Sequence, residues 1–335
     1  MRAPQVSAWR GRRVLVTGAA GFIGSHMVER LAGAGALVRA FVRYNSRNEY
    51  GWLDTIDESA LRSIEIFRGD LTNSDAVTDA VADRDVVVHL GALIPIPYSY
   101  RHPREFVAAN VVGTLNILEA CRRNGIERLV HVSSSEVYGT PKEVPIPETA
   151  RLNAQSPYAA TKVGADQLAL SYRAAFELPV VIARPFNTYG PRQSARAVIP
   201  TIVTQALARE HIEIGSTSTT RDFLFVADTV DGLLRCGETA GIEGEVFNLG
   251  TGRETSIAEV IEVVSAALGR ELSVVARDER FRPAGSEVER LCADTSLADD
   301  RLGWAPEVPL EVGLRRTLDW FADAIDTYKP SLYNV

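Results

Sequence analysis

Short apolar runs alternate with helical patterns along most of the chain. Runs such as RVLVT, ALVRAFV, IEIFRGD, DVVVHLGAL, LVHVSS and LPVVIARP have the length and β-branched content of buried strands. Stretches between them, such as HMVERLAGAG, REFVAANVVGTLNILEACRRNG and SPYAATKVGADQLALSYRAA, have the composition or the apolar spacing of helices. This alternation predicts an α/β fold with a doubly wound, mostly parallel sheet.

The pattern loosens from about Asn187 onward. The polar run GSTSTTRD resembles a loop, VFNLGTG returns to strand character, and LEVGLRRTLDWFADAI has a helical pattern. The sequence therefore predicts two interleaved domains. The larger covers 1–186, with 222–250 returning to it, and a smaller mixed α/β domain covers 187–221 and 251–335.

A glycine-rich segment follows the first predicted strand. Gly18, Gly21 and Gly24 form G-x-x-G-x-x-G, and a helical pattern begins directly afterwards. Glycines allow a tight turn and let backbone N–H groups approach a pyrophosphate at the helix N-terminus. With a strand before it and a helix after it, the pattern favours a dinucleotide site over a glycine corner without a ligand.

The segment after the second predicted strand indicates which dinucleotide to expect. A carboxylate at this place would bind a ribose 2′-hydroxyl and repel a 2′-phosphate. The chain instead has Arg43, Tyr44, Asn45, Ser46 and Arg47, which suit a phosphorylated ribose. We expect NADP, with NAD as the alternative if these arginines are only surface charges. Further cofactor contacts are expected near the ends of other strands, at Asp70, Leu71, Leu90 and Ala92.

Four polar side chains follow the strand LVHVSS or lie on the next helix. Ser134 and Glu136 come where the strand ends, and Tyr158 and Lys162 are four residues apart, so they share one helix face. Open α/β sheets bind ligands at the carboxyl ends of their strands. An ammonium beside a phenol favours the phenolate, which would make the tyrosine a better base near pH 7. Tyr-x-x-x-Lys alone is usually ordinary helix surface, so the preceding serine and glutamate carry the prediction.

Composition narrows the classes of partner. A net charge of −7 argues against nucleic acid or an anionic membrane as the main partner. An anionic substrate would then need local cations, and Arg192, Arg221 and Arg282 lie in loop-like segments. These arginines are candidate diphosphate ligands, although each taken singly is as well explained as a surface charge.

Cysteine content and hydropathy indicate several features that we do not expect in this protein. The three cysteines have no paired spacing, so neither a disulfide framework nor a metal site is predicted. The N-terminal MRAPQVSAWRGRR has no apolar centre of the kind found in signal peptides. No uninterrupted apolar stretch is long enough for a membrane span, so we expect a cytoplasmic enzyme.

Taken together, the motifs TGAAGFIGS, GDL, HLGA, NVVGTLN, YAATK and RPFNTYGPR resemble the extended short-chain dehydrogenase/reductase family, in its nucleotide-sugar epimerase and dehydratase branch. The resemblance covers residues 12 to 325. It implies a Rossmann domain, a smaller C-terminal substrate domain and commonly a homodimer formed through a four-helix bundle. It also implies a bound nicotinamide cofactor that transiently oxidises a sugar carbon, with further contacts from Phe22, Ile23 and Asn110.

Within this branch, the segment SSSEVYG is the most informative. UDP-galactose-type epimerases usually lack a glutamate at the position of Glu136, whereas 4,6-dehydratases carry it. Ser134-Ser135-Glu136 is similar to the GDP-mannose dehydratases, and the whole chain also resembles N-acetylglucosamine dehydratases of legionaminic acid synthesis. UDP-glucuronate decarboxylases share SEVYG, but their arginine-serine-rich segment before the tyrosine is absent here, and no cation for a C6 carboxylate is evident.

The resemblance implies a mechanism. Tyr158 would take the 4-hydroxyl proton while Ser134 hydrogen-bonds the same oxygen, and Lys162 would hold the nicotinamide ribose. Glu136 would then remove the C5 proton before water leaves C6, giving a 4-keto-6-deoxy sugar. Since Ser135 stands where thymidine-linked dehydratases have an aspartic acid, Glu136 would act as both base and acid. The alternative for Glu136 is a loop carboxylate paired with an arginine.

Substrate contacts are also implied by the resemblance. Asn187, Val198, Ile199 and Pro200 match positions that hold the diphosphate and base in relatives, and Arg282 with Glu287 matches a segment of the GDP-mannose enzymes. We expect a UDP- or GDP-linked hexose or N-acetylhexosamine. The alternatives are a 4-epimerase, then a UDP-glucuronate decarboxylase, and last a non-catalytic NADP-binding protein.

Overall fold

Seven parallel strands form the central sheet of the computed structural model, which describes residues 8–329. The predicted absence of a signal peptide concerns a segment whose residues 1–7 lie outside this range. The strand order is β11-β6-β5-β4-β1-β2-β3, which confirms the predicted doubly wound α/β fold. The strands are β1 (Arg13–Thr17), β2 (Leu37–Arg43), β3 (Glu65–Gly69), β4 (Val86–His89), β5 (Arg128–Val132), β6 (Val180–Pro185) and β11 (Val246–Leu249).

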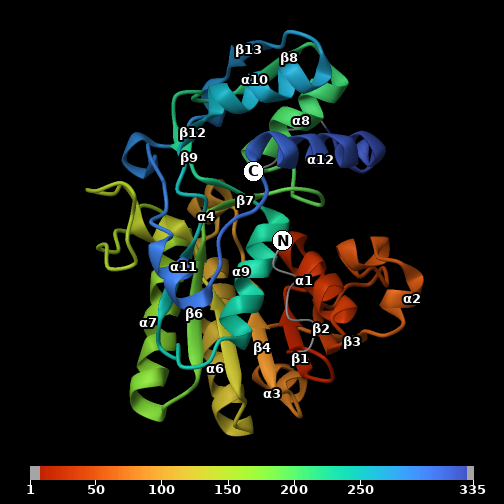
Figure 1. The fold of residues 1–335 in the computed structure, drawn as a ribbon, viewed down its shortest axis with the longest axis vertical. Helices are drawn as coiled ribbons and strands as arrows, with labels where there is room; N and C mark the ends of the chain where they lie inside the picture. Colours follow the sequence, from red (N-terminus) through yellow and green to blue (C-terminus); the bar gives the residue numbers. More distant parts are fainter. Residues whose placement is uncertain (1–7, 330–335) are drawn as a thin grey trace.

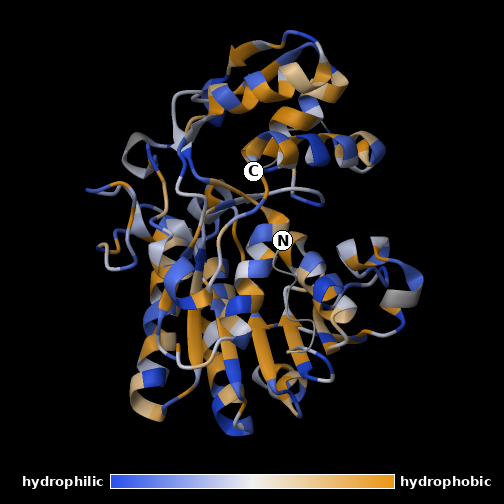
Figure 2. Ribbon diagram, viewed as in Figure 1, coloured by the Kyte–Doolittle hydropathy of each residue, from blue (hydrophilic) through white to orange (hydrophobic). Residues whose placement is uncertain are grey.

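Helices cover both faces of the sheet because alternate strand residues are apolar on both sides. In β1, Val14 and Val16 join one buried cluster, whereas Leu15 joins the other. Figure 2 shows the apolar strands enclosed between helices with hydrophilic outer surfaces. One face packs against α1 (Phe22–Gly33), α9 (Val226–Glu238) and α11 (Ser296–Leu302), and the other against α3 (Ser74–Val81), α6 (Gly113–Asn124) and α7 (Pro157–Phe176).

A smaller group of elements lies beyond the carboxyl ends of the strands (Figure 1). Its strands pair only in twos, as β10 with β7, β12 with β9 and β13 with β8. The members are β7 (Asn187–Tyr189), α8 (Val198–Ala208), β8 (His211–Ile214), β9 (Thr220–Arg221), β10 (Phe223–Phe225), β12 (Thr255–Ser256), α10 (Ile257–Leu268), β13 (Ser273–Ala276), η4 (Asp278–Arg280), η5 (Ala284–Ser286), α12 (Leu310–Asp323) and η6 (Ile325–Thr327).

Short helices lie in the connections between the strands. The helix predicted over 104–125 contains a π-helical segment, η2, before it continues as α6. These elements are η1 (Gly51–Thr55), α2 (Glu58–Leu61), α4 (Ile96–Arg101), α5 (Pro103–Phe106), η2 (Val107–Val112) and η3 (Ser135–Tyr138).

The register of the sheet aligns polar residues at the carboxyl ends of neighbouring strands. Thr17 at the end of β1 pairs with His89 of β4, and His89 pairs with His131 of β5. Both histidine side chains are buried, and their ring centroids are 5.6 Å apart. The sheet therefore brings a row of hydrogen-bonding side chains under the edge where ligands of such folds bind.

Candidate active site

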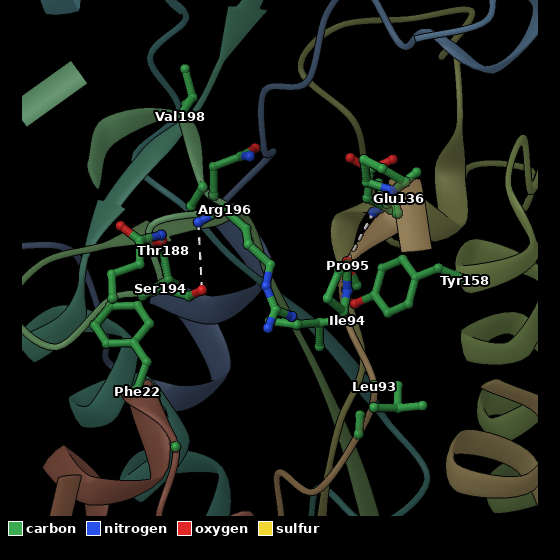
Figure 3. A pocket seen from close by; sticks show the side chains of 18 of the residues that line it. Phe22, Leu93, Ile94, Pro95, Glu136, Tyr158, Thr188, Ser194, Arg196 and Val198 are labelled. Atoms are coloured by element: carbon green, nitrogen blue, oxygen red, sulfur yellow. Dashed lines mark hydrogen bonds between the residues drawn. The ribbon is translucent and has the colours of Figure 1, made fainter. Parts of the chain in front are cut away.

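A cleft of about 1270 Å³ lies at the carboxyl ends of the strands, between the sheet and the C-terminal elements. Figure 3 shows Tyr158 and Glu136 on one wall and Phe22, Ser194 and Val198 on the other. Residues at or directly after the carboxyl ends of β1 to β6 and residues of α8 contribute to the same lining, so segments far apart in sequence share one space. The cleft therefore stands where ligands of doubly wound sheets bind.

The glycine turn leaves no space for a side chain at its closest approach. Gly18 has φ +68°, and a Cβ on Gly24 would stand 2.1 Å from the Gly18 carbonyl oxygen. Helix α1 begins directly after Gly21, with no side-chain cap and no acidic residue in its first turn. Its first N–H groups can thus bind an anion, so this turn fits the pyrophosphate of a dinucleotide. Gly18, Gly21, Phe22, Ile23 and Gly24 all line the cleft.

The ribose end of this cleft holds fewer of the predicted cations than expected. Arg43 lines the cleft at the end of β2, with Nε 3.7 Å from Asp70 Oδ2. Ser46 and Arg47 are not part of the lining, and Arg47 pairs with Glu49 at 2.8 Å. The loop after β2 carries these two residues away from the cleft, so Arg43 is the predicted cation that it contains. The other expected contacts, Leu71, Leu90 and Ala92, line the cleft together with Asp70.

Ser134, Glu136, Tyr158 and Lys162 line one part of the cleft. Ser134 caps η3, and its Oγ accepts a hydrogen bond from the Glu136 N–H (3.2 Å). Helix α7 is capped by Ser156 and places Tyr158 and Lys162 one turn apart on its buried side. The structure thus brings together the four side chains that the sequence predicted.

Burial dominates the protonation of the tyrosine. It raises the pKa of Tyr158 to about 12, while the hydrogen bond with Ser134 acts in the opposite direction. Burial is thus the largest influence on this pKa in the structure, and the expectation that the Lys162 ammonium favours the phenolate stays a prediction. Burial also lowers the pKa of Lys162 to about 8, against the opposing charge of Asp166. The lysine Nζ donates a hydrogen bond to the Val132 carbonyl (2.6 Å).

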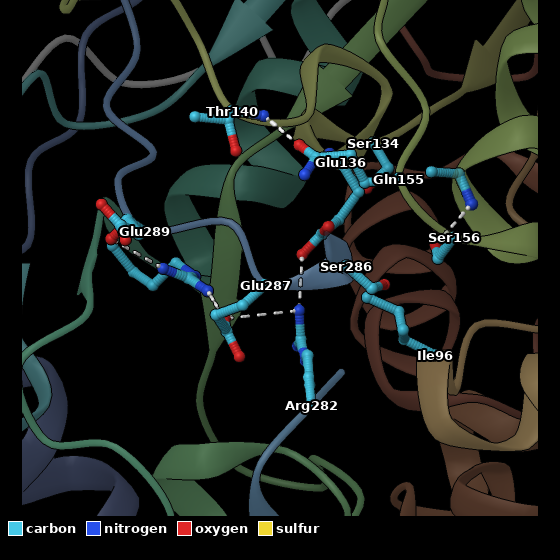
Figure 4. A network of polar contacts seen from close by, with 12 residues as sticks. Ile96, Ser134, Glu136, Thr140, Gln155, Ser156, Arg282, Ser286, Glu287 and Glu289 are labelled. Carbon is cyan, nitrogen blue, oxygen red and sulfur yellow. Dashed lines mark hydrogen bonds and ion pairs between the residues drawn. The ribbon is translucent and has the colours of Figure 1, made fainter. Parts of the chain in front are cut away.

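Two arginines and two glutamates alternate across the cleft (Figure 4). Arg282 Nη1 lies 3.7 Å from Glu136 Oε1 and 4.0 Å from Glu287 Oε1. Arg221 Nη2 donates to the same Glu287 oxygen at 3.1 Å. Glu136 therefore combines both expectations from the sequence, since it lines the cleft near Tyr158 and also pairs with an arginine. The Arg282 guanidinium thus lies next to Glu136, although the sequence had indicated no cation for a sugar C6 carboxylate.

Four other predicted residues lie outside the cleft lining. Arg192 is buried against α1, where it pairs with Glu29 and donates to Ser25 Oγ (3.3 Å), so it is not available as a diphosphate ligand. Ser135 is the first residue of η3 and is buried. Pro200 is buried in α8 next to Ile199, which does line the cleft.

Asn110 is the fourth of these residues, and it has a structural task instead. Its side chain accepts from the Leu93 N–H (2.8 Å) and donates to the Leu93 carbonyl (2.9 Å) and to Thr161 Oγ1 (3.0 Å). It thereby ties the segment after β4, which lines the cleft, to α7.

Several cleft residues were missed from the sequence. The Arg196 side chain extends into the space between the two walls in Figure 3. Ile94 and Tyr100, from the segment after β4, also line the cleft. The only signal in the sequence was that Arg196 follows a glycine-proline turn in a loop-like stretch, as Arg192 does. Arg192 stays outside the cleft lining because it pairs with Glu29 of α1, and Arg196 is the arginine of this loop that enters the cleft.

Two further observations concern the described residues. Among residues 8–329, no three or more His, Cys, Asp and Glu side chains are grouped so that they could hold a metal ion. Within the same range, no helix is both long enough and apolar enough to cross a membrane.

Comparisons with known proteins place these features in a family. The family "GDP-mannose 4,6 dehydratase" matches residues 15–317. A UDP-glucose 4-epimerase of Mycolicibacterium smegmatis is 37% identical over 92% of this chain and 98% of its own. A dTDP-glucose 4,6-dehydratase of Streptomyces antibioticus is 34% identical over 95% and 94%.

Solved structures agree with the fold. Epimerase Mth375 of Methanothermobacter thermautotrophicus has a TM-score of 0.87 and 32% identity, covering 96% of this chain and 95% of that one. MoeE5, determined with UDP-glucuronic acid and NAD, has a TM-score of 0.83 and 32% identity over 93% and 99%. The relatives thus include both dehydratases and epimerases.

Proposed function

Because the chain belongs to the GDP-mannose 4,6-dehydratase family of nucleotide-sugar dehydratases and epimerases, we propose that it is a nucleotide-sugar 4,6-dehydratase. The observation that carries this proposal is Glu136, a carboxylate in the same cleft as Ser134 and Tyr158. A simple 4-epimerase needs no base at C5, whereas elimination of water from C5 and C6 does. The product would be a 4-keto-6-deoxy sugar.

The cofactor proposed for this site is NADP, with NAD as the alternative. Gly18, Gly21 and Gly24 would hold the pyrophosphate. Arg43 would meet a 2′-phosphate, because it ends β2 and no carboxylate follows it directly in the sequence. A nicotinamide cofactor supplies a hydride acceptor for the sugar and returns the hydride later. MoeE5 was determined with NAD, which supports the alternative.

The chain's own groups would move the protons. Tyr158 takes the proton of the sugar 4-hydroxyl, and Ser134 hydrogen-bonds the same oxygen. Since the pKa of Tyr158 is about 12, its proton affinity must fall in the reacting complex, and the Ser134 hydrogen bond already acts in that direction. Lys162 would add a positive charge next to the tyrosine, as long as it stays protonated.

Glu136 would perform the elimination. Once C4 is a ketone, the C5 proton is acidic, and the carboxylate removes it while the C6 hydroxyl leaves as water with that proton. Ser135 is buried beneath the cleft, which supports giving both the base and the acid role to Glu136. Arg282, 3.7 Å from Glu136, must then release part of this contact when a sugar enters.

The proposed substrate is a UDP- or GDP-linked hexose or N-acetylhexosamine. Arg221 and Arg282 supply cations for the diphosphate, and the apolar Val198 and Ile199 line the opposite part of the cleft with Asn187. MoeE5 was determined with UDP-glucuronic acid, which supports a nucleotide sugar in this position. We assign these contacts to the segments 187–221 and 251–335, as the nucleotide-sugar-binding domain of a cytoplasmic enzyme.

We also infer a homodimer in which α6 and α7 face a second copy. Val107, Val112 and Leu115 are 36–48% exposed along η2 and α6, and Phe176 at the end of α7 is 52% exposed. The two helices pack side by side, so these apolar side chains belong to neighbouring elements. Exposed apolar residues grouped in this way are typical of an interface.

Mass spectrometry of the purified protein incubated with UDP-, GDP-, dTDP- and CDP-sugars tests the reaction. Loss of one water without added reductant would support the dehydratase and identify the nucleotide and sugar. A product of unchanged mass and altered retention would instead establish the 4-epimerase, which the name of the Mycolicibacterium relative favours. Loss of carbon dioxide from a glucuronate would mean a decarboxylase with Arg282 as the cation.

A further inference from the structure

The segment 281–287, here the Arg282 segment, begins and ends next to the C-terminal elements. Before it, the N–H of Arg277 donates to the Ile214 carbonyl of β8 (2.9 Å). After it, the N–H of Leu291 donates to the Thr220 carbonyl of β9 (3.3 Å). Between these two attachments the segment contributes to the cleft, through the lining residues Phe281, Arg282, Pro283 and Glu287.

Two hydrogen bonds attach the Arg282 segment to α4 and to the start of α7. The hydroxyl oxygens of Tyr100 on α4 and of Ser286 are 2.5 Å apart. Gln155, directly before the residue that caps α7, donates from Nε2 to the Gly285 carbonyl (3.1 Å). Ser286 is only 9% exposed, so its hydroxyl would lose a partner that water replaces poorly if the segment moved away.

Gln155 also joins the Arg282 segment to the turn that carries Glu136. Its Oε1 accepts a hydrogen bond from the N–H of Thr140, two residues after η3. Both polar atoms of this side chain are therefore used, one for the segment and one for the turn. Figure 4 shows Gln155 together with Glu136 and Arg282. One side-chain amide thus relates the segment, the η3 turn and α7 to one another.

The position of the segment determines where its charged groups stand in the cleft. Arg282 Nη1 lies 3.7 Å from Glu136 Oε1, and Glu287 accepts from Arg221 at 3.1 Å. Partly exposed ion pairs such as the first contribute little to holding a segment by themselves. The hydrogen bonds of Tyr100 and Gln155 are additional attachments, and a segment that is already ordered loses less freedom when a ligand binds.

We propose that Tyr100 and Gln155 are positioning residues that hold the Arg282 segment closed over the cleft, so that Arg282 is in place when the diphosphate of a sugar nucleotide arrives. The task of Arg282 toward a diphosphate rests on the proposed function. The closure itself rests on the two hydrogen bonds and is independent of which reaction follows.

Limited trypsin digestion of the full chain reports opening of the segment without any assay of activity. Trypsin cleaves after arginine unless proline follows, so the bond after Arg280 is a cleavage point, whereas Arg282 is followed by Pro283. At low trypsin concentration the cleavage rate follows the population of the open form. Mass spectrometry of the fragments identifies the bond. Cleavage after Arg47, in the loop after β2, serves as the internal reference.

A double-mutant cycle tests the bond between the two hydroxyl groups. We expect Tyr100→Phe and Ser286→Ala each to speed cleavage after Arg280 about three- to tenfold, the usual net contribution of one hydrogen bond. The double variant should be cleaved no faster than the single variants, because both changes remove the same bond. Unchanged rates, or a double variant whose acceleration is the product of the single effects, would overturn the proposal.

Gln155→Glu tests the second attachment. The glutamate keeps an acceptor for the Thr140 N–H but puts a second oxygen where Nε2 donated to the Gly285 carbonyl. The bond to the segment is then lost while the bond to the turn remains. We expect cleavage after Arg280 to be at least threefold faster than in the natural protein. An unchanged rate would remove Gln155 from the proposal and contradict it.

Tyr98→Phe is the matched control for the loss of a tyrosine hydroxyl from α4. Tyr98 is partly buried, as Tyr100 is, but its hydroxyl donates to Glu105 (2.9 Å) and its side chain is not part of the cleft lining. We expect this variant to leave cleavage after Arg280 unchanged. An acceleration as large as in Tyr100→Phe would mean that a loosened α4 is responsible, and would overturn the proposal.

Protection by free nucleoside diphosphates tests the link to the ligand. The probes are UDP, GDP, dTDP and CDP, each added with saturating NADPH or NADH. A diphosphate that binds the closed form should slow cleavage after Arg280 in proportion to its occupancy, both in the natural protein and in Tyr100→Phe. If none of the probes slows this cleavage, Arg282 is not held in place for a diphosphate and the proposal is overturned.

Failure of this inference can be told apart from failure of the proposed function. If the protein proves to be an epimerase, the proposed function fails, but the digestion experiments still decide the roles of Tyr100 and Gln155. If dehydration is observed and the variants leave cleavage after Arg280 unchanged, this inference alone fails.

Discussion

Glu136 is the residue on which the choice between elimination and epimerisation depends. We expect Glu136→Gln to lower formation of the dehydrated sugar by about 10²–10⁴-fold, the usual contribution of a positioned general base. Oxidation at C4 should remain, because Tyr158 and Ser134 are unchanged. The measurement is product formation by mass spectrometry together with nicotinamide absorbance under single-turnover conditions.

Glu287→Gln is the matched control, since Glu287 pairs with the same Arg282 at 4.0 Å but follows η5, whereas Glu136 lies on η3. It should raise KM and leave elimination intact. Full dehydrated product from Glu136→Gln would refute the role of Glu136.

At the scale of one side chain, the proposed preference for NADP over NAD depends on Arg43. We expect Arg43→Gln to weaken NADPH binding about tenfold, roughly 1.4 kcal/mol, and to leave NADH binding nearly unchanged, because the guanidinium would face the 2′-phosphate. Fluorescence titration measures both affinities. Arg47→Gln is the control, since Arg47 pairs with Glu49 outside the cleft lining. A natural protein that binds NADH more tightly than NADPH would contradict the NADP proposal.

At the scale of elements, the turn between β1 and α1 depends on close approach of backbone atoms. A Cβ on Gly24 would stand 2.1 Å from the Gly18 carbonyl oxygen, so Gly24→Ala must displace the turn. We expect a loss of about 1–3 kcal/mol of stability, as for other overpacked sites, and weaker dinucleotide binding. Thermal unfolding and cofactor titration measure the two effects.

Helix α1 supplies its own control. A Cβ on Gly33 meets nothing within 4 Å, and Gly33 has an ordinary φ. Gly33→Ala should therefore leave cofactor binding unchanged and raise stability by up to about 1 kcal/mol through helix propensity. Equal behaviour of the two variants would show that the turn tolerates a side chain and does not need to approach a ligand closely.

At the scale of the whole molecule, two arginines from the second half of the chain have different tasks. Arg192 joins the loop after β7 to Glu29 of α1, so Arg192→Met should lower stability by about 1.5–3 kcal/mol and leave KM unchanged. Arg282→Met should instead raise KM, because Arg282 lines the cleft. Unfolding and steady-state kinetics on both variants test the contrast. A raised KM for Arg192→Met at unchanged stability would contradict it.

The proposed homodimer is also a property of the whole molecule. We expect Leu115→Glu to weaken the proposed dimer at least tenfold, because it puts a charge on the apolar face of α6. Analytical ultracentrifugation measures the effect. Val274→Glu on β13 is the control, since this exposed valine lies in the C-terminal group of elements (Figure 1). A natural protein that sediments as a monomer would refute the dimer.

Expectations from the sequence succeeded where the signal is local. The spacing of Tyr158 and Lys162 puts them on one helix face, and the glycine pattern follows a strand and precedes a helix, as predicted. The parallel sheet follows from the alternation of strands and helices, because parallel strands require crossovers of this length. Local periodicity is sufficient for these features, since each depends on residues close together in the chain.

The sequence by itself therefore determined the fold class, the dinucleotide turn and the four-residue constellation of the cleft. Only the tertiary structure decided that Arg192 pairs with Glu29, 163 residues away, and that burial raises the pKa of Tyr158. It also decided that the buried Asp166 carboxylate pairs with Arg184 of β6. The physical reason is that periodicity depends on neighbours in sequence, whereas burial and charge pairing depend on which distant elements pack together.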